Sequence, residues 1–439
     1  MKCGVEIQLN LLKRFSMRER LCFQDKVLFI IIFILPYLTG GPWFTLTSFS
    51  SVFMAIGPSF LCFILSVYLF IYSLCKHYRI IHKRLYVVLV LAVCWSILKV
   101  IETSIAYGIT EALVIYRKNY ILLPSFLLCL PYISSLSINK IQLLFKLILR
   151  WIIPLTIIYL LQCIGIPVFK QDVRLDSVSG ISVTRNIIGL PPIFPAIFAI
   201  CFVEYIFFRQ RKMLYYVLIF IVLCFVSYTR NLIATSVIII AITVIYYSYK
   251  KGIGNIFKYF MYALLVVTVL RIIAPVSFKF WDNLISNTIN SELVEDTGTY
   301  AFRQRLISSA IETTQTHNCL WTGLGYVRDA EKGEYSFVLG GDTYVAPIIW
   351  CEGLIGLFFR VLPCVILCVN GFYWLRKGRD ERTCALALII VATVLSQVLN
   401  YVQTSIFVKY NETLAILFIV YVYLRKYHYA AIKTSKQIR

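Results

Sequence analysis

Long apolar runs separated by short polar segments form the dominant pattern along this chain. Runs close to the ~20 residues that cross a bilayer as a helix recur from near the start to near the end. The pattern predicts membrane-spanning helices at approximately 27–46, 51–75, 86–108, 119–138, 148–167, 186–208, 213–228, 232–248, 259–276, 345–370, 383–406 and 412–425. The expected fold is an all-α polytopic membrane protein with about 12 transmembrane helices, in which residues 1–439 form a single integral-membrane domain.

One long polar segment interrupts the pattern, at residues 277–344. Within it, FRQRLISSAIETT (302–314) places Leu306, Ile307, Ala310 and Ile311 at helical spacing. This spacing predicts a short amphipathic helix that lies on the membrane surface.

The basic residues indicate which side of the membrane each polar segment faces. Of 43 Lys and Arg, 28 fall in alternate polar segments, at 1–26, 76–85, 139–150, 209–212, 249–258, 376–382 and 425–439. Because cytoplasmic segments of membrane proteins are enriched in Lys and Arg, we expect these segments and both termini to be cytoplasmic. The 277–344 loop then lies outside the cytoplasm, and it is acidic, with 5 basic and 9 acidic residues.

Composition excludes several other classes of function. The chain is 60% hydrophobic, and its net charge of +22 follows the sides of a membrane rather than a solvated basic face, so we expect no nucleic-acid partner. The 14 cysteines mostly sit inside apolar runs, and the 4 histidines do not pair at zinc spacing. We therefore expect neither a metal site nor a cofactor.

A few charged residues fall within the expected spans. Lys99 and Glu102 stand three residues apart, which favours a structural pair. Glu204 and Arg360 lie near cytoplasmic ends and are expected to extend toward water, whereas Glu352, deeper in its span, is a candidate for lining a cavity.

Four arginines fall on the expected outer side, against the usual charge bias: Arg185, Arg230, Arg303 and Arg305. A guanidinium group matches phosphate with two parallel hydrogen bonds and keeps its charge at any accessible pH. These arginines are candidates for binding an anionic substrate. The alternatives are a snorkelling anchor or a loop salt bridge.

Four segments also resemble a known family in their order along the chain. They are VSYTRNLIATSVIIIAI (226–242), FRQRLISSA (302–310), CLWTGLGY (319–326) and DTYVAPIIWCEGLIGL (342–357). This order is similar to that of the bacterial O-antigen polymerase and O-antigen ligase superfamily, over roughly 185–360. The resemblance implies a metal-independent membrane glycosyltransferase of the bacterial inner membrane that uses undecaprenyl-diphosphate-linked oligosaccharides. A chain-length regulator and a flippase are then candidate partners.

The resemblance also assigns roles to individual residues. Arg230 matches the arginine of a serine-arginine pair, with Thr229 in place of serine, and Arg303 is the better match to a loop arginine. The ligase pattern has a His-Asn pair where this chain has Asp342 and Thr343.

The missing histidine favours a polymerase of O-antigen or capsular repeat units over a ligase that transfers glycan to lipid A-core. A flippase or transporter is a further alternative. The expected catalytic residues are Arg230, Arg303 and Asp342. Asp342 would act as a base, or else would cap the following helix. Arg185, Arg305 and Tyr344 are expected to bind diphosphate or glycan.

Overall fold

The computed structural model describes most of the chain. The described residues are 20–35, 58–113, 122–163, 166, 173–178, 181–186, 193–226, 230–252, 254–273, 275–290, 299–327, 333, 338–339, 343, 345–378, 380–399 and 411–437.

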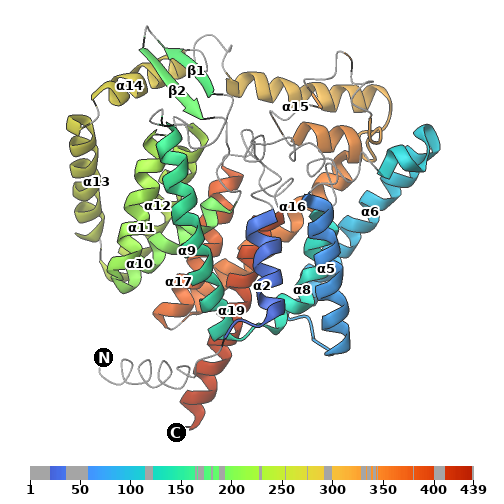
Figure 1. The fold of residues 1–439 in the computed structure, drawn as a ribbon, viewed down its shortest axis with the longest axis horizontal. Helices are drawn as coiled ribbons and strands as arrows, with labels where there is room; N and C mark the ends of the chain where they lie inside the picture. Colours follow the sequence, from blue (N-terminus) through green and yellow to red (C-terminus); the bar gives the residue numbers. More distant parts are fainter. Residues whose placement is uncertain are drawn as a thin grey trace.

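The described residues form a bundle of helices with one β-hairpin at one end (Figure 1). In chain order the elements are α2 (Phe23–Phe29), the π-helical turn η1 (Ile30–Ile34), α5 (Pro58–Cys75), α6 (Lys83–Tyr107), α8 (Leu122–Ser135), α9 (Ile138–Cys163), β1 (Val173–Val178), β2 (Ile181–Asn186), α10 (Phe194–Phe208), α11 (Arg211–Val226), α12 (Arg230–Lys251), α13 (Gly254–Ile273), α14 (Pro275–Ile289), α15 (Thr299–Thr316), α16 (Val345–Lys377), α17 (Glu381–Val398) and α19 (Asn411–Gln437).

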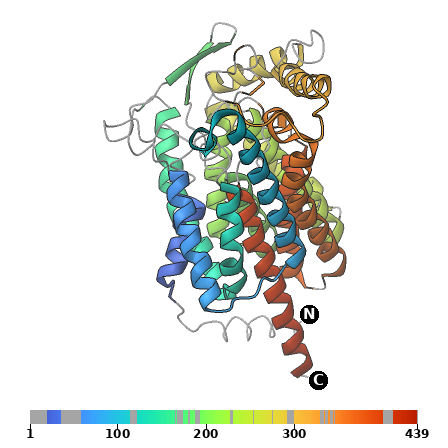
Figure 2. The ribbon, with the colours of Figure 1, turned by 90° about the vertical axis from the view of Figure 1, so that its right-hand side faces the viewer.

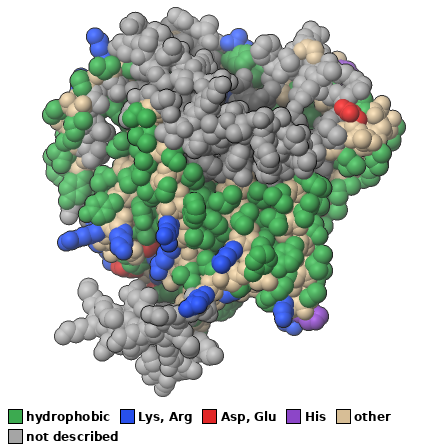
Figure 3. Space-filling view, in the orientation of Figure 1, with side chains coloured by type: hydrophobic (Ala, Val, Ile, Leu, Met, Phe, Trp, Pro, Cys, Tyr) green, Lys and Arg blue, Asp and Glu red, His purple; other side chains and the backbone are tan. Residues whose placement is uncertain are grey.

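The apolar runs of the sequence correspond to these helices, since each expected span overlaps one of them. Within the described part of the chain, five helical segments are long and apolar enough to cross a membrane. They are Lys83–Tyr107, Ile138–Ile158, Asn231–Lys251, Val345–Lys377 and Glu381–Val398. On the face drawn in Figure 3, hydrophobic side chains form a broad band across the bundle. The chain thus has the helices expected of a membrane protein.

Burial identifies three helices as the centre of the bundle, and Figure 2 shows one of them, α19 in red, running through its middle. In α10, α17 and α19 nearly every described side chain from one end of the apolar run to the other is buried, whichever side of the helix it occupies. A helix that is apolar all round is stable only when neighbours surround it. Peripheral helices such as α13 expose large apolar side chains instead, including Leu265 and Ile272.

The basic segments of the sequence meet at one end of this bundle. Lys251 at the end of α12 pairs with Glu381 at the start of α17, and Arg382 pairs with Glu204 near the end of α10. Lys426 of α19 donates to a backbone carbonyl in the turn between α8 and α9. Lys and Arg side chains accordingly gather along the lower edge of the hydrophobic band in Figure 3. We call this the basic end.

The buried charged residues of the described helices are paired. Lys99 and Glu102 form the expected ion pair at 2.5 Å. The expectation that Glu204 and Arg360 extend toward water is wrong, because both are buried and paired, Glu204 with Arg382 and Arg360 with Glu352. An apolar surrounding favours such pairing, since an unpaired charge would lose its hydration without compensation.

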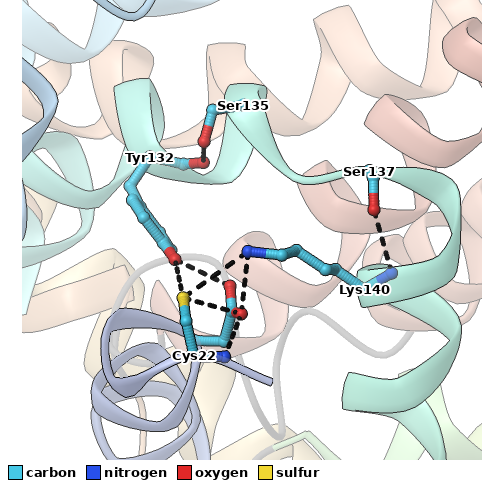
Figure 4. A network of polar contacts seen from close by, with 6 residues as sticks. Cys22, Tyr132, Ser135, Ser137 and Lys140 are labelled. Atoms are coloured by element: carbon cyan, nitrogen blue, oxygen red, sulfur yellow. Dashed lines mark hydrogen bonds and ion pairs between the residues drawn. The ribbon is translucent and has the colours of Figure 1, made fainter. Parts of the chain in front are cut away.

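A polar network at the basic end fastens the first helix to the bundle (Figure 4). The carboxylate of Asp25 accepts from the backbone N–H and the thiol of Cys22, at 2.8 and 2.9 Å, and from the hydroxyl of Tyr132 at 2.7 Å. The ammonium group of Lys140 lies 3.0 Å from the same carboxylate. Three elements, α2, α8 and α9, are thereby joined through one side chain.

Replacing Asp25 with asparagine is expected to destabilise the protein by about 1–3 kcal/mol at neutral pH, because a buried carboxylate loses charge-assisted hydrogen bonds. Burial alone would raise the pKa of Asp25, but the bonds from Cys22, Tyr132 and Lys140 outweigh it and lower the pKa. A carboxyl that is more acidic when folded contributes stability above its unfolded pKa of ~3.9 and loses it as pH falls through the folded value.

The measurement is the thermal midpoint in detergent between pH 3 and pH 8. The gap between wild type and Asp25→Asn should be constant above about pH 5 and should shrink below about pH 4. Asp282→Asn is the control, because Asp282 is exposed on α14. Equal midpoints for Asp25→Asn and wild type at pH 7 would contradict a fastening role for this network.

Candidate functional site

The end of the bundle opposite the basic end carries α14, α15 and the β-hairpin, which lie across the ends of the other helices (Figure 1). The α14 helix packs on the end of α11: Trp281 donates from its indole N–H to the carbonyl of Phe225 at 3.0 Å. Phe280 and Trp281 are buried against Phe225 and Ile233. We call this the outer end. The sequence pattern did not predict α14 as a separate helix.

The amphipathic helix expected at 302–314 is present as α15. Its buried residues include Leu306, Ala310 and Thr314, which recur at helical spacing. This face packs on the first turns of α16, around Val345 and Ile349. An apolar stripe on an otherwise polar helix therefore fixes which way α15 faces.

The two arginines of α15 lie on different faces. Arg303 precedes Leu306 by three residues and so shares the stripe that faces the bundle, and its Nε atom is inaccessible to solvent. Arg305 is exposed. The structure thus brings Arg303, rather than Arg305, against the body of the protein.

Arg230 is the first residue of α12, whose first turn contains no acidic residue. The backbone is described there and the side chain is not. The start of α12 lies at the outer end, where Ile233 of α12 packs against Phe280 and Trp281 of α14. The N-terminus of a helix has unpaired N–H groups and the positive end of the helix dipole, and both attract an anion. An arginine at this position adds a positive charge to the same region.

Arg185 lies in β2, directly opposite Arg174 of β1 in the antiparallel register. The hairpin is at the outer end, with β1 near α14 and β2 near α9. The register thus sets two arginine positions opposite one another at the outer end. Arg174 was missed from the sequence, although alternating residues on both sides of Ser179-Gly180 are typical of a hairpin.

The helix α16 is broken at Gly353, where the backbone has φ 68° and ψ −171°. Residues 319–326, which we call the glycine loop, pair with the backbone on both sides of the break. Leu324 and Gly325 donate to carbonyls at the end of the first half of the helix, at 2.7 and 3.1 Å. The N–H groups of Leu354 and Ile355 donate to loop carbonyls, at 3.0 and 3.2 Å. The loop therefore supplies partners for helix ends that would otherwise be unsatisfied.

Glycines make this contact possible. A Cβ atom on Gly323 would lie 2.5 Å from the backbone nitrogen of Gly353, and one on Gly353 would overlap the carbonyl oxygen of Trp321. Both glycines also have positive φ, which other residues adopt at a cost. The segments CLWTGLGY (319–326) and EGLIG (352–356) therefore form the two sides of one backbone contact.

The start of α16 is where the sequence placed Asp342 and Tyr344, and both lie outside the described residues. Between them, Thr343 is 1% exposed. Its hydroxyl accepts from the backbone N–H of Val345 at 3.3 Å, so this first helical N–H has a side-chain partner.

No protein-family model matches this chain, and no curated protein matches it either. The chemistry of the outer end is therefore inferred from its residues.

The residues expected to form the site are brought together in part. The structure unites α15, the glycine loop and the first half of α16 in one buried cluster, with Arg303 on its margin. The start of α12 and the hairpin add Arg230, Arg174 and Arg185 at the same end. Within the described ranges, no group of three or more His, Cys, Asp or Glu residues could hold a metal ion. The arginine-bearing elements can attract an anion such as a diphosphate.

Proposed function

We propose that the protein polymerises undecaprenyl-diphosphate-linked oligosaccharide repeat units at the outer face of a bacterial inner membrane. The observation that carries the proposal is the position of Arg303, on the face of α15 that packs over the start of α16. Arg303 lies on the same face of α15 as Leu306, which packs against the first turn of α16, and Asp342 precedes that helix by three residues in the sequence. The product would be an O-antigen, a capsule or a related polysaccharide.

The reaction is a glycosyl transfer between two lipid-linked molecules. A hydroxyl at the non-reducing end of a new repeat unit attacks the anomeric carbon of the growing glycan. The bond from that carbon to the diphosphate breaks, and undecaprenyl diphosphate leaves. Arginines would stabilise the charge on the leaving diphosphate, and Asp342 would accept the proton of the attacking hydroxyl.

Membrane sidedness supports the same proposal. Residues of several segments rich in Lys and Arg meet at the basic end, which agrees with a cytoplasmic position for that end. With about 12 crossings, the outer end and the 277–344 loop face the opposite compartment, where the lipid-linked repeat units would be joined.

The break at Gly353 favours a transporter, because discontinuous helices form many substrate sites in transporters. In those sites the helix ends point at the ligand. Here backbone groups on both sides of the break bind the glycine loop instead, and the nearby carboxylate of Glu352 is paired with Arg360. These contacts weigh against a ligand position at the break.

Reconstitution tests the proposal. The purified protein is placed in vesicles that contain lipid-linked repeat units, with a metal chelator present, and glycan length is followed by gel electrophoresis. We expect extension from repeat units alone. Transfer that occurs only after lipid A-core is added would establish the ligase alternative. Movement of repeat units between leaflets without extension would establish the flippase alternative.

A further inference from the structure

A buried ion pair crosses the break in α16. Glu352 is the last residue before Gly353, and Arg360 follows in the second half of the helix. The guanidinium Nε and Nη2 atoms donate to the two carboxylate oxygens at 2.9 and 2.5 Å, and the side chains are 3% and 1% exposed for Arg360 and Glu352. Removing two charges from water costs about as much free energy as their attraction returns, so a gain in net stability does not by itself explain this pair.

The carboxylate of Glu352 binds two further segments. The hydroxyl of Tyr326, in the glycine loop, donates to Oε1 at 2.8 Å, and the hydroxyl of Ser96, in α6, donates to the same oxygen at 3.3 Å. A Cβ atom on Gly356 would overlap the Cβ of Glu352 and lie 2.8 Å from Oε2. The glycine therefore leaves the room that this carboxylate occupies.

The glycine loop is held at several points by these contacts. Tyr326 is 2% exposed, and its backbone N–H donates to the hydroxyl of Thr103 at 3.1 Å. The ammonium group of Lys99 donates to the carbonyl of Gly323 at 3.3 Å. The loop follows α15 directly, and Cys319 donates to a carbonyl of the last turn of that helix at 2.8 Å. A shift of the loop would thus move the end of α15.

We propose that Glu352 is a positioning residue: through Tyr326 and Arg360 it fixes the glycine loop, and with it α15 and Arg303, over the start of α16. This role rests on the proposed polymerisation. Glu352 itself does not meet substrate, since it is buried and both of its oxygens have donors. Fully satisfied buried polar networks select one arrangement of the groups that they join.

The test compares Glu352→Gln and Tyr326→Phe with Glu204→Gln. Glu204 is also a buried carboxylate paired with an arginine, Arg382, but it lies at the basic end. All three variants lose a hydrogen bond or an ion pair inside the protein. Only the first two touch the glycine loop.

Two measurements are made on each variant. Amide hydrogen exchange of residues 317–326 reports whether the loop stays bound to α16. We expect it to rise about tenfold or more in Glu352→Gln and Tyr326→Phe, from the loss of a hydrogen bond to a charged group, and to stay unchanged in Glu204→Gln. In the extension assay, kcat should fall about tenfold in the same two variants, with KM for the lipid-linked donor little changed.

The outcomes separate the positioning role from the proposed function. Wild-type protein that never extends glycan refutes the function, while the exchange data still decide whether Glu352 fixes the loop. Unchanged exchange at 317–326 in Tyr326→Phe overturns the positioning role, including in the case where Glu352→Gln fails to fold. Equal losses of kcat in all three variants would also overturn it, because stability alone would then explain them.

Discussion

Replacing Arg303 with alanine is expected to slow chain extension about 100- to 1,000-fold, the usual cost of removing one preorganised group that stabilises charge in a transition state. Arg303 shares the face of α15 that packs on α16, and its Nε is inaccessible to solvent. A guanidinium group in that position is held in place before substrate arrives. Its effect should therefore appear mainly in kcat, with single repeat units accumulating on their lipid carrier.

Arg305→Ala is the matched control. It removes the same charge from the same helix, two residues away, but on the exposed face. We expect a change of less than about fivefold, because exposed charges are screened by salt and solvent. Arg303→Lys should recover little activity, since an ammonium group cannot form the paired hydrogen bonds of a guanidinium group. Similar losses in the Arg303 and Arg305 alanine variants would show that only the net charge of α15 matters.

The helices could be predicted from the sequence because each depends on residues that are close together along the chain. Apolar runs of membrane length specify helices wherever they occur, and residues such as those of α17 are buried on all sides as their composition indicates. The amphipathic stripe of α15 is equally local. The hairpin also had a local signal, in the alternation around Ser179-Gly180, but its strands are short and lie in a chain dominated by apolar runs of membrane length.

The joint between the glycine loop and α16 could not be predicted from the sequence. Gly323 and Gly353 are far apart along the chain, and glycines are frequent in membrane helices. Only the folded structure shows that neither position has room for a Cβ atom, because the backbone around the other glycine lies against it. The contact between the glycine loop and α16 also explains why Arg360 is buried. Near the end of a span it would ordinarily extend toward water, but Glu352, bonded to the loop, gives it a buried partner.

Replacing Asp342 with asparagine is expected to reduce chain extension at least 100-fold, which is the lower range for loss of a general base. The alternative role for Asp342 is to cap the helix that begins at Val345, and asparagine caps nearly as well as aspartate. The first N–H of that helix already donates to the hydroxyl of Thr343. A cap from Asp342 is therefore not required at that position, which favours the catalytic role.

The matched variant is Thr343→Val, which removes the observed acceptor at nearly constant side-chain volume. It should lower the thermal midpoint in detergent, because a buried N–H loses its side-chain partner, while chain extension by the remaining folded protein changes little. Asp342→Asn should give the reverse result, a normal midpoint with strongly reduced extension in the vesicle assay. If Asp342→Asn instead lowered the midpoint and kept near-normal extension per folded molecule, Asp342 would be a structural residue of this junction, and the base of the proposed transfer would have to be sought elsewhere at the outer end.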